Sequence, residues 1–478
     1  MTKDLPDNWV IAPLRELLDS LESGSRPKGG VKGIESGVPS LGGEHLDSNG
    51  GFKFEKTRFV PEAFVAKMTR GRIQHRDILV VKDGATTGKT SFVGASFPFT
   101  EAVINEHVFL CRCRMNIDPK YVFYFLYSAE GNRQILEDFR GAAQGGISQR
   151  FAEIVKVPLA PIDQQYRIVA EIEMQFSRLD EAVANLKRVK ANLKRYKAVV
   201  LKAAVEGRLV ETEAEIARRE GRSYETGAQL LQRILETRRS QWKGKGKYKE
   251  PAAPDTTNLP ELPEGWVWAT VESLSMKVAD GVHKKPNYVP EGIPFVTVKN
   301  LTAGNGISFE NLNYVTPKDH EEFCKRTHPE RGDILISKDG TLGVVRLVET
   351  DRLFSVFVSV ALVKPVMYSQ SRYLALALES PTVQRQMVPK GSGLQHIHLE
   401  DLRADCIPIP PHAEQERIVA EVDRRLSLVR EVEAQVDVNV QRSERLRQSI
   451  LASSFSGALI CHATEWNVTI TNREIAHG

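Results

Sequence analysis

Cysteine is scarce in this sequence, and long apolar runs are missing from it. The five cysteines are odd in number and form no metal-ligand pairs, which favours reduced thiols over disulfides or a structural metal; they lie at positions 111, 113, 324, 406 and 461. No apolar run is long enough to span a bilayer, and the first residues lack the apolar core of a signal peptide. These absences predict a cytoplasmic protein without membrane contact.

The motifs that mark common enzymes are also missing. The sequence has no His-Glu-x-x-His, no Cys-x-x-Cys, no Gly-x-Ser-x-Gly, no glycine-rich cofactor fingerprint and no Asn-Pro-Pro-aromatic run. Of its 11 histidines, only His396 and His398 are closely paired, and two ligands do not make a metal site. We therefore expect no catalytic residue, no metal and no cofactor bound by this chain, which is better interpreted as a binding protein.

One stretch resembles a phosphate-binding loop. Gly84-Ala-Thr-Thr-Gly88-Lys89-Thr90 has three residues between its glycines where the nucleotide-binding loop has four. Its repeat counterpart, beginning at Gly340, lacks the Lys-Thr pair altogether. We interpret both stretches as turns after strands, and a nucleotide-binding enzyme stays the first alternative.

Charge and length set weak bounds on function. A chain of 478 residues suits two or three domains, and a formal charge of 65 − 61 = +4 decides little by itself. From Lys187 to Lys202 the chain carries basic residues and no acidic one. Such a run is usually a solvated helix face, although it could also line nucleic acid.

The strongest signal present is an internal repeat. Pro158–Val183 aligns without a gap on Pro408–Glu433, at an offset of 408 − 158 = 250, and the same offset relates Gly207-x-Leu209 to Gly457-x-Leu459. A second repeated motif, Leu-Pro-x-x-Trp, ends at Trp9 and at Trp266, which we expect to be core anchors. Two copies of one segment predict two copies of one structural unit.

Each copy of the long segment predicts a helix of about 66 Å, from about residue 163 to 206 in the first copy. Apolar residues recur at alternating four- and three-residue steps, as in a coiled coil. The order globule, helix, linker, globule, helix requires two helices that pack together to run antiparallel, with an approximate two-fold axis between them. The residues predicted to pack are Ile172, Phe176, Leu179, Val183, Leu186, Val422, Leu426, Val429 and Val436.

The remainder of each half shows short β-like runs, a short helical stretch and a loop that contains glycine and glutamine, which predicts a mixed α/β globule. The helical stretches are Tyr121–Phe139 and Ser371–Val388. The Lys- and Pro-rich linker contains one short amphipathic piece, Gln229–Trp242. The predicted boundaries are 1–157 for the first globule, 158–210 for the first helix, 211–261 for the linker, 262–407 for the second globule, 408–460 for the second helix and 461–478 for a tail.

Polar residues suited to base edges or phosphates cluster where loops are expected. Arginine, lysine, glutamine and histidine are the types that contact guanine, adenine and backbone phosphates, although surface loops are polar in any protein. The predicted DNA-binding residues are Arg26, Lys28, Arg72, Gln74, Lys82, Gln144 and Gln149 in the first half, and Lys284, Lys285, Lys338, Lys390, Gln395, His396 and His398 in the second.

The whole pattern resembles the specificity (S) subunit of a type I restriction–modification system. The resemblance rests on the Leu-Pro-x-x-Trp openings, the Asp-Ile-Leu strand ending in Lys-Asp-Gly, the Gly/Gln loop and the Pro-x-x-x-Gln-x-Arg-Ile-Val-Ala-Glu helix start, each present twice. It implies that the globules are target recognition domains, which read a split, asymmetric sequence in double-stranded DNA, and that the long helices are spacers.

The resemblance also implies partners. Two methyltransferase (M) subunits that use S-adenosylmethionine, and restriction (R) subunits that use ATP, would carry the chemistry. The second alternative is a coiled-coil adaptor that never reads DNA directly.

Overall fold

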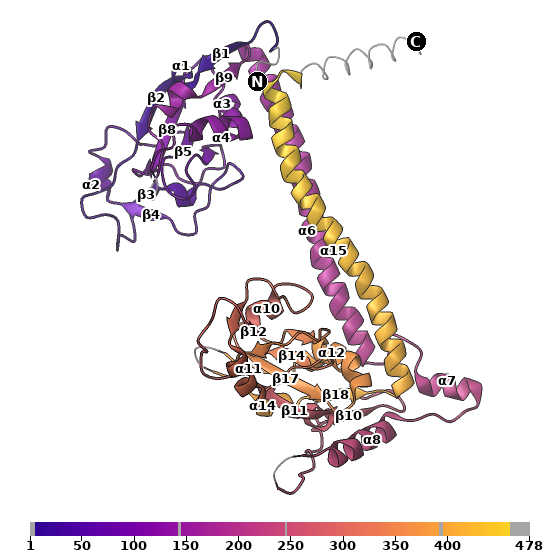
Figure 1. Ribbon diagram of the computed structural model, residues 1–478. Helices are drawn as coiled ribbons and strands as arrows, with labels where there is room; N and C mark the ends of the chain where they lie inside the picture. Colours follow the sequence, from indigo (N-terminus) through magenta and orange to yellow (C-terminus); the bar gives the residue numbers. More distant parts are fainter. Residues whose placement is uncertain (1–4, 142–144, 244–245, 392–394, 459–478) are drawn as a thin grey trace, which may run out of the picture. The chain divides into compact units, whose positions relative to one another are not determined.

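The structure is a computed structural model that describes residues 5–141, 145–243, 246–391 and 395–458. The chain divides into two compact units (Figure 1). Unit 1 comprises Met1–Lys187 with Asp437–Gly478, and unit 2 comprises Arg188–Val436. Gln144 and the predicted tail lie outside the described residues. No helix in the described ranges is both long and apolar enough to cross a membrane.

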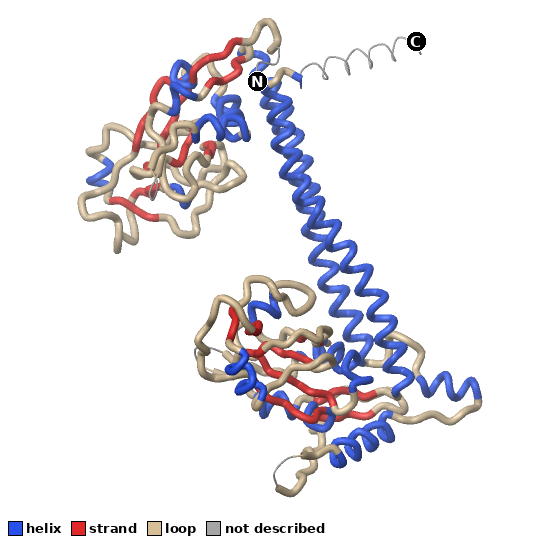
Figure 2. Tube along the Cα trace, in the orientation of Figure 1, coloured by secondary structure: helices blue, strands red, loops and turns tan. Residues whose placement is uncertain are grey.

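The globule of unit 1 is built on a four-stranded antiparallel sheet in the order β2-β8-β5-β6, beside a three-stranded sheet β4-β3-β7 and the two-stranded ladder β1-β9 (Figure 2). Its elements are β1 (Val10–Pro13), α1 (Leu14–Leu17), β2 (Leu18–Ser23), β3 (Val38–Leu41), η1 (Gly43–His45), β4 (Arg58–Val60), α2 (Glu62–Val65), β5 (Ile78–Val81), β6 (Thr90–Phe92), β7 (Val103–Ile104), β8 (Val108–Cys113), α3 (Pro119–Tyr127), α4 (Ala129–Leu136), α5 (Phe151–Ile154) and β9 (Lys156–Leu159).

Unit 2 repeats this plan strand for strand, with sheets β11-β17-β14-β15, β13-β12-β16 and β10-β18. Its elements are β10 (Val267–Thr270), α9 (Val271–Leu274), β11 (Ser275–Asp280), β12 (Ile293–Val296), α10 (Val298–Thr302), β13 (Asn313–Val315), α11 (Pro317–Cys324), β14 (Ile334–Ser337), β15 (Val345–Leu347), β16 (Ser355–Val356), β17 (Val360–Pro365), η2 (Tyr368–Gln370), α12 (Ser371–Glu379), α13 (Pro381–Gln384), α14 (Leu399–Ala404) and β18 (Cys406–Ile409).

The central strand of each main sheet is buried on both faces. In β5, Ile78 and Val80 pack into one apolar cluster, while Leu79 and Val81 pack into another. Successive side chains of a strand point to opposite faces, so a continuous apolar run is what a doubly covered strand requires. In β14, Ile334 and Leu335 divide between two clusters in the same way.

The two long helices are α6 (Ile162–Val205) and α15 (His412–Phe455), which confirms the mixed α/β class with a long helix after each globule. Of the residues predicted to pack, Leu179, Val183 and Leu186 are half-buried. The others are buried, namely Ile172, Phe176, Val422, Leu426, Val429 and Val436.

The repeated tryptophans anchor each globule to a long helix. Trp9 is buried and donates its indole N–H to Gln164 Oε1 at 2.9 Å. Trp266 is also buried and donates to Glu414 Oε1 at 3.1 Å. Since residue 164 corresponds to 414 at the 250 offset, the two halves build the same anchor with a neutral and a charged acceptor.

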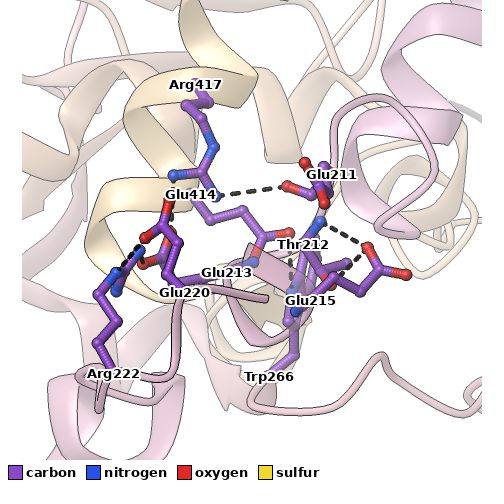
Figure 3. Close-up of polar contacts among 9 residues, drawn as sticks. All are labelled: Glu211, Thr212, Glu213, Glu215, Glu220, Arg222, Trp266, Glu414 and Arg417. Carbon is purple, nitrogen blue, oxygen red and sulfur yellow. Dashed lines mark hydrogen bonds and ion pairs between the residues drawn. The ribbon is translucent and has the colours of Figure 1, made fainter. Parts of the chain in front are cut away.

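The charged acceptor holds a further segment in place (Figure 3). Glu414 Oε2 accepts the backbone N–H of Glu213 at 2.9 Å, at the first residue of α7 (Glu213–Glu220). The Glu213 carboxylate pairs with Arg417 at 2.7 Å and with Arg222 at 2.6 Å. Two arginines and one backbone donor thus compensate the two buried carboxylates.

The glycine that ends each long helix packs on the other Leu-Pro-x-x-Trp motif. Gly207 has φ +66, and a Cβ added there would lie 2.4 Å from Pro263 Cγ. Gly457 has φ +79, and its Cβ would lie 2.5 Å from Pro6 Cγ. Both positions need glycine for the left-handed backbone and for the close approach.

Two features differ from the sequence-based expectation. The predicted helical stretches are each broken in two, because Ser128 and Ser380 adopt extended backbone and cap α4 and α13. The linker contains α7 as well as α8 (Gly227–Ser240), whereas only one short helix was expected. The signal for α7 was readable, since Thr212 and Glu215 form a capping box and Gly221 ends the helix at φ 63.

Candidate nucleic-acid interface

In unit 2, basic side chains from three distant segments meet at one carboxylate, Asp280, at the end of β11. Lys338 Nζ, just after β14, lies 3.4 Å from Asp280 Oδ2, and His283 Nε2 lies 3.3 Å from Asp280 Oδ1. Arg326, which follows α11, donates Nε to the Asp280 carbonyl at 3.1 Å and pairs with its carboxylate through a second nitrogen. Asp339 also lies near Lys338, at 3.8 Å.

The electrostatics of this group favour a fixed array of cations. Burial raises the pKa of Asp280, but hydrogen bonds from Arg326 and His283 and the charge of Lys338 outweigh it, and the pKa is lowered from its usual value. The ionised carboxylate therefore holds Lys338, whose side chain is only 11% exposed, and Arg326, which is 49% exposed. An arginine oriented through two of its nitrogens is suited to bind a phosphate or a guanine edge.

The Gly/Gln loop lies against the same strand end. Ile397 donates its backbone N–H to the Lys338 carbonyl at 2.9 Å. The backbone of His396 forms isolated antiparallel β-bridges with Asp339 and with Lys390. The rings of His396 and His398 are 4.5 Å apart. Lys338, His396 and His398 were each predicted to bind DNA, and the structure brings them together. Gln395, another predicted residue, is exposed beside them.

The other predicted residues of unit 2 flank this group. Lys284 and Lys285 are exposed and directly follow His283 in the loop after β11. Lys285 Nζ lies 5.8 Å from the centre of the Tyr288 ring. Lys390 pairs with Asp401 at 2.7 Å.

Unit 1 has a basic group at the equivalent place. β2 and β11 start at residues 18 and 275, an offset of 257, and that offset relates Arg26 to His283 and Lys28 to Lys285. Arg26 and Lys28 are exposed, and Arg26 pairs with Glu106 at 2.8 Å.

The Gly/Gln loop of unit 1 also closes on a lysine at a strand end. Ile147 donates its N–H to the Lys82 carbonyl at 2.8 Å, as Ile397 does to Lys338. Lys82 Nζ lies 5.8 Å from the centre of the Phe109 ring, and the neighbouring Asp83 bonds His107 at 2.6 Å. The side-chain amide of Gln149 donates to the Leu21 carbonyl at 3.3 Å.

Two predicted residues of unit 1 lie elsewhere. Arg72 bonds Glu101 at 2.8 Å and the Val65 carbonyl at 2.5 Å. Gln74 donates its backbone N–H to Asp77, which directly precedes β5. Lys82 follows the other end of this four-residue strand, which spans about 13 Å. Arg72 and Gln74 therefore do not join the group around Lys82.

The loop-like stretch Gly84–Thr90 connects β5 to the antiparallel strand β6. Gly84 and Gly88 have φ 90 and 83, as turns require, and Lys89 Nζ donates to the Leu46 carbonyl at 3.2 Å. A phosphate-binding loop leads from a strand into a helix N-terminus, and here a strand follows. The geometry supports the interpretation as a turn.

Sequence reasoning missed Asp280 and Arg326. They are 46 residues apart, and their ion pair depends on tertiary packing that no local pattern reveals. Position 280 corresponds to Ser23 in unit 1, so the repeat gave no hint of a carboxylate. Among the described residues, no group of three or more His, Cys, Asp or Glu could hold a metal ion.

Comparison with protein-family models identifies a known domain within this chain. The model of the type I restriction modification DNA specificity domain matches residues 269–436. This range covers most of the globule of unit 2 and the first part of α15.

Named relatives extend the similarity over the chain. The EcoKI specificity subunit of Escherichia coli strain K12 is 22% identical over 95% of this chain and 90% of its own length. The EcoBI specificity subunit of Escherichia coli is 23% identical over 75% of this chain and 69% of its own. A solved structure from work on complex assembly and conformational transition of the type I R-M system shares the fold, with a TM-score of 0.61 and 18% identity over 95% of this chain and all of that chain.

The domain match, the relatives and the repeated fold agree with one another. Specificity in a type I restriction system is what the family description and the names of both relatives have in common. Together they show that this chain is similar, over most of its length, to specificity subunits of type I restriction enzymes.

Proposed function

We propose that this chain reads a bipartite DNA target, with residues 1–157 and 262–407 as two target recognition domains that each bind one half-site. One observation carries the proposal. Both halves place a lysine at the end of a central strand, Lys82 or Lys338, and both fold the Gly/Gln loop onto it. A recurring basic group at equivalent strand ends is suited to two separate contacts with a duplex.

The target of this proposal is asymmetric. Arg26 of unit 1 corresponds to His283 of unit 2, and Ser23 corresponds to Asp280, so the two groups present different donors and acceptors. Different side chains at equivalent positions select different bases. The predicted DNA-binding residues other than Arg72 and Gln74 form these two surfaces, with Gln144 outside the described residues.

We further propose that α6 and α15 pair as an antiparallel coiled coil that sets the distance between the half-sites. Contacts within each unit support this. In unit 1, Arg447 lies over the Phe176 ring, 4.7 Å from its centre, and pairs with Asp180. In unit 2, Tyr196 interacts with Arg425. A later residue of α6 thus meets an earlier residue of α15, which is the order of an antiparallel pair about a pseudo-two-fold axis.

The chemistry of the system belongs, in this proposal, to partner subunits. Two methyltransferase subunits with S-adenosylmethionine, and restriction subunits with ATP, would dock on the two repeated halves. The chain contributes recognition and assembly. Two identical partners fit a scaffold whose helix starts share the sequence Gln-x-Arg-Ile-Val-Ala-Glu in both copies.

The test is adenine-methylation mapping of DNA from cells that express this chain with and without its neighbouring methyltransferase subunit. We expect a bipartite, asymmetric motif that is methylated only when both subunits are present. If the two subunits form a complex and no such motif appears, the adaptor alternative is favoured. A weak dependence of DNA affinity on salt would also count against direct DNA binding.

A further inference from the structure

In unit 2 a lysine compensates the aspartate of the Lys-Asp-Gly turn that follows β14. Lys338 Nζ lies 3.8 Å from Asp339 Oδ2 and 3.4 Å from Asp280 Oδ2. The Lys338 side chain is 11% exposed, so the ammonium group is held beside the two carboxylates. The charge of Asp339 is thus balanced by a residue of its own turn.

In unit 1 the same turn, after β5, is arranged differently. Lys82 Nζ lies 5.8 Å from the centre of the Phe109 ring. The position of Phe109 is taken by Ala361 in unit 2, because these residues pair with equivalent positions of β5 and β14. The aspartate of the turn has a histidine as its partner, since His107 Nδ1 donates to Asp83 Oδ1 at 2.6 Å.

The Gly/Gln loop fixes the backbone of Asp83. Asp83 forms an isolated antiparallel β-bridge with Gly146, and a Cβ added to Gly146 would lie 2.8 Å from Asp83 Cβ. Glycine at this position allows the loop to pack directly against the aspartate. The Asp83 side chain is still 31% exposed. The strand end and the loop therefore hold one partly exposed carboxylate at a defined place on the candidate interface.

The histidine that binds Asp83 also contacts a second carboxylate. His107 Nε2 lies 3.4 Å from Glu106 Oε1, and the same oxygen lies 2.8 Å from Arg26 Nε. In unit 2 the position of His107 is taken by Ser359, since both carbonyls accept the backbone N–H of the lysine that follows the central strand. The imidazole is thus held on both sides, which makes His107 a positioning residue for the Asp83 carboxylate.

We propose that Asp83 selects a base in the half-site of unit 1 by accepting a hydrogen bond from the exocyclic amino group of adenine or cytosine. In the major groove these amino groups are donors, whereas thymine O4 and guanine O6 are acceptors. A carboxylate accepts several hydrogen bonds, so the bond from His107 leaves Asp83 able to accept another from a base. The inference rests on the proposed function, in which residues 1–157 read one half-site.

The charge of Asp83 would make this selection strict. Phosphates line the grooves of a duplex, and a carboxylate among them opposes binding unless a donor reaches it. A base with a carbonyl at the same place would leave Asp83 facing another acceptor. We expect discrimination of about tenfold or more between an amino group and a carbonyl. Unit 2 should not share this selection, because Lys338 compensates Asp339.

The test is an isosteric change in the complex of this chain with its methyltransferase subunit. Asp83→Asn keeps an oxygen for the bond from His107 and places an amide N–H group where the parent chain has its second carboxylate oxygen. The preference at one position should therefore shift from an amino-bearing base towards thymine or guanine. Methylation mapping identifies the position, and fluorescence anisotropy should show that the ratio of affinities for the two kinds of duplex falls about tenfold or more.

The matched control is Asp163→Asn, which removes the same charge from an exposed residue that pairs with Arg167 on α6. It should leave the ratio of affinities unchanged. Base analogues then identify the base that is read. Purine in place of adenine, or pyrimidin-2-one in place of cytosine, removes the amino group and should weaken binding of the parent complex about tenfold or more, with little effect on Asp83→Asn.

The positioning role of His107 has its own readout. His107→Asn retains a side-chain N–H near the place of Nδ1 and should keep the preference of the parent complex. His107→Leu removes the donor and should lose most of that preference. Should Asp83→Asn fail to fold, as judged by thermal unfolding, the difference between these two variants decides.

Three results would overturn the inference. They are an unchanged base preference in Asp83→Asn, an equal loss of affinity for every duplex, and equal preferences in His107→Asn and His107→Leu. Each of them leaves the proposed function standing if the parent complex methylates a bipartite motif. Absence of any such motif in the parent complex would remove the proposed function together with this inference.

Discussion

Trp266 donates its indole N–H to the buried carboxylate of Glu414, 3.1 Å away, where the other half of the chain pairs Trp9 with the neutral Gln164. Burial raises the pKa of Glu414, although hydrogen bonds from the Glu213 backbone and from Trp266 and the charge of Arg417 act in the opposite direction. Loss of a hydrogen-bond donor costs more stability when the buried acceptor is charged than when it is neutral. The two equivalent anchors should therefore respond differently to loss of the indole N–H.

Replacing each tryptophan by phenylalanine tests this difference. Trp266→Phe should lower the free energy of local opening at the start of α15 by about 1–3 kcal/mol, and Trp9→Phe should lower it at the start of α6 by about 1 kcal/mol. Native-state hydrogen exchange of peptides from the two helix starts measures both values. Equal losses would show that the charge of Glu414 does not matter to the anchor.

Asp405 should make the stability of unit 2 depend on pH. Burial, and then the nearby charge of Asp401, raises its pKa to about 7, and Oδ2 has no hydrogen-bond partner in the described part of the chain. Because the folded pKa exceeds the ordinary 3.8, the folded state is favoured when the group is protonated, and this stability is lost as the pH rises through about 7.

Asp405→Asn removes the ionisation. Relative to the parent chain, the variant should gain on the order of 2–4 kcal/mol of stability at pH 8.5 and little at about pH 4. Urea unfolding at both pH values measures the gain, and Asp351→Asn, at an exposed carboxylate paired with Arg331, is the control. A gain that is the same at both pH values would contradict the assignment. The residue of unit 1 that is equivalent to Asp405 is Val155, so this position of the fold accommodates an uncharged side chain.

Arg326→Ala should weaken recognition of the half-site read by unit 2. The variant loses an oriented guanidinium and leaves Asp280 with one cation fewer, which should cost about 1–3 kcal/mol in binding of the assembled complex. The neighbouring Lys325→Ala is the matched control, because Lys325 is 71% exposed and pairs with Glu322 in the preceding helix. Fluorescence anisotropy with DNA that carries mutations in one half-site or the other measures how much each protein depends on each half-site. Unchanged affinity in Arg326→Ala would remove this residue from the interface.

Gln395→Ala should change the preference at one half-site only. The residue is exposed on the Gly/Gln loop of unit 2, and a lost glutamine contact relaxes selectivity at the base it reads. Methylation mapping of cells that carry the variant shows which positions become degenerate. Gln441→Ala, on the exposed surface of α15, should leave the motif unchanged. Equal weakening of both half-sites would refute the division of labour between the two globules.

Leu179→Asp and Leu186→Asp should impair assembly whatever the DNA sequence. Both side chains are half-buried in α6, and a charge there disfavours pairing of the helix by several kcal/mol. Size-exclusion chromatography with the methyltransferase subunit measures assembly. Asn192→Asp, at an exposed position of the same helix, is the control. Normal assembly together with lost recognition of a single half-site would contradict this prediction.

The elements that sequence could predict are those set by local chemistry repeated over many residues. The long helices follow from apolar residues such as Ile172 and Val422 at coiled-coil spacing, with Pro161 before one helix and Gly207 after it. The break at Ser128 was missed because a serine inside an apolar stretch is compatible with a continuous helix until its cap bond to Gly131 is seen.

The candidate site was predictable only in part. Lys338 and His396 were found because each stands beside a turn that the repeat makes recognisable. Arg326 reaches the site through an ion pair with Asp280 across 46 residues, which is a property of the folded chain alone. Arg72 lies away from the group around Lys82 because its guanidinium contacts Glu101 and the Val65 carbonyl, and its role in DNA binding stays a prediction.

The double burial of β5 and β14 has a consequence for how such a protein can change. With Ile78 committed to one apolar cluster and Leu79 to the other, neither face of the central strand is available to contact a ligand. In the proposed function, contact with DNA falls to strand ends and loops, whose replacement leaves both cores untouched. A new DNA preference can therefore arise by exchange of loops on a constant frame, one half at a time.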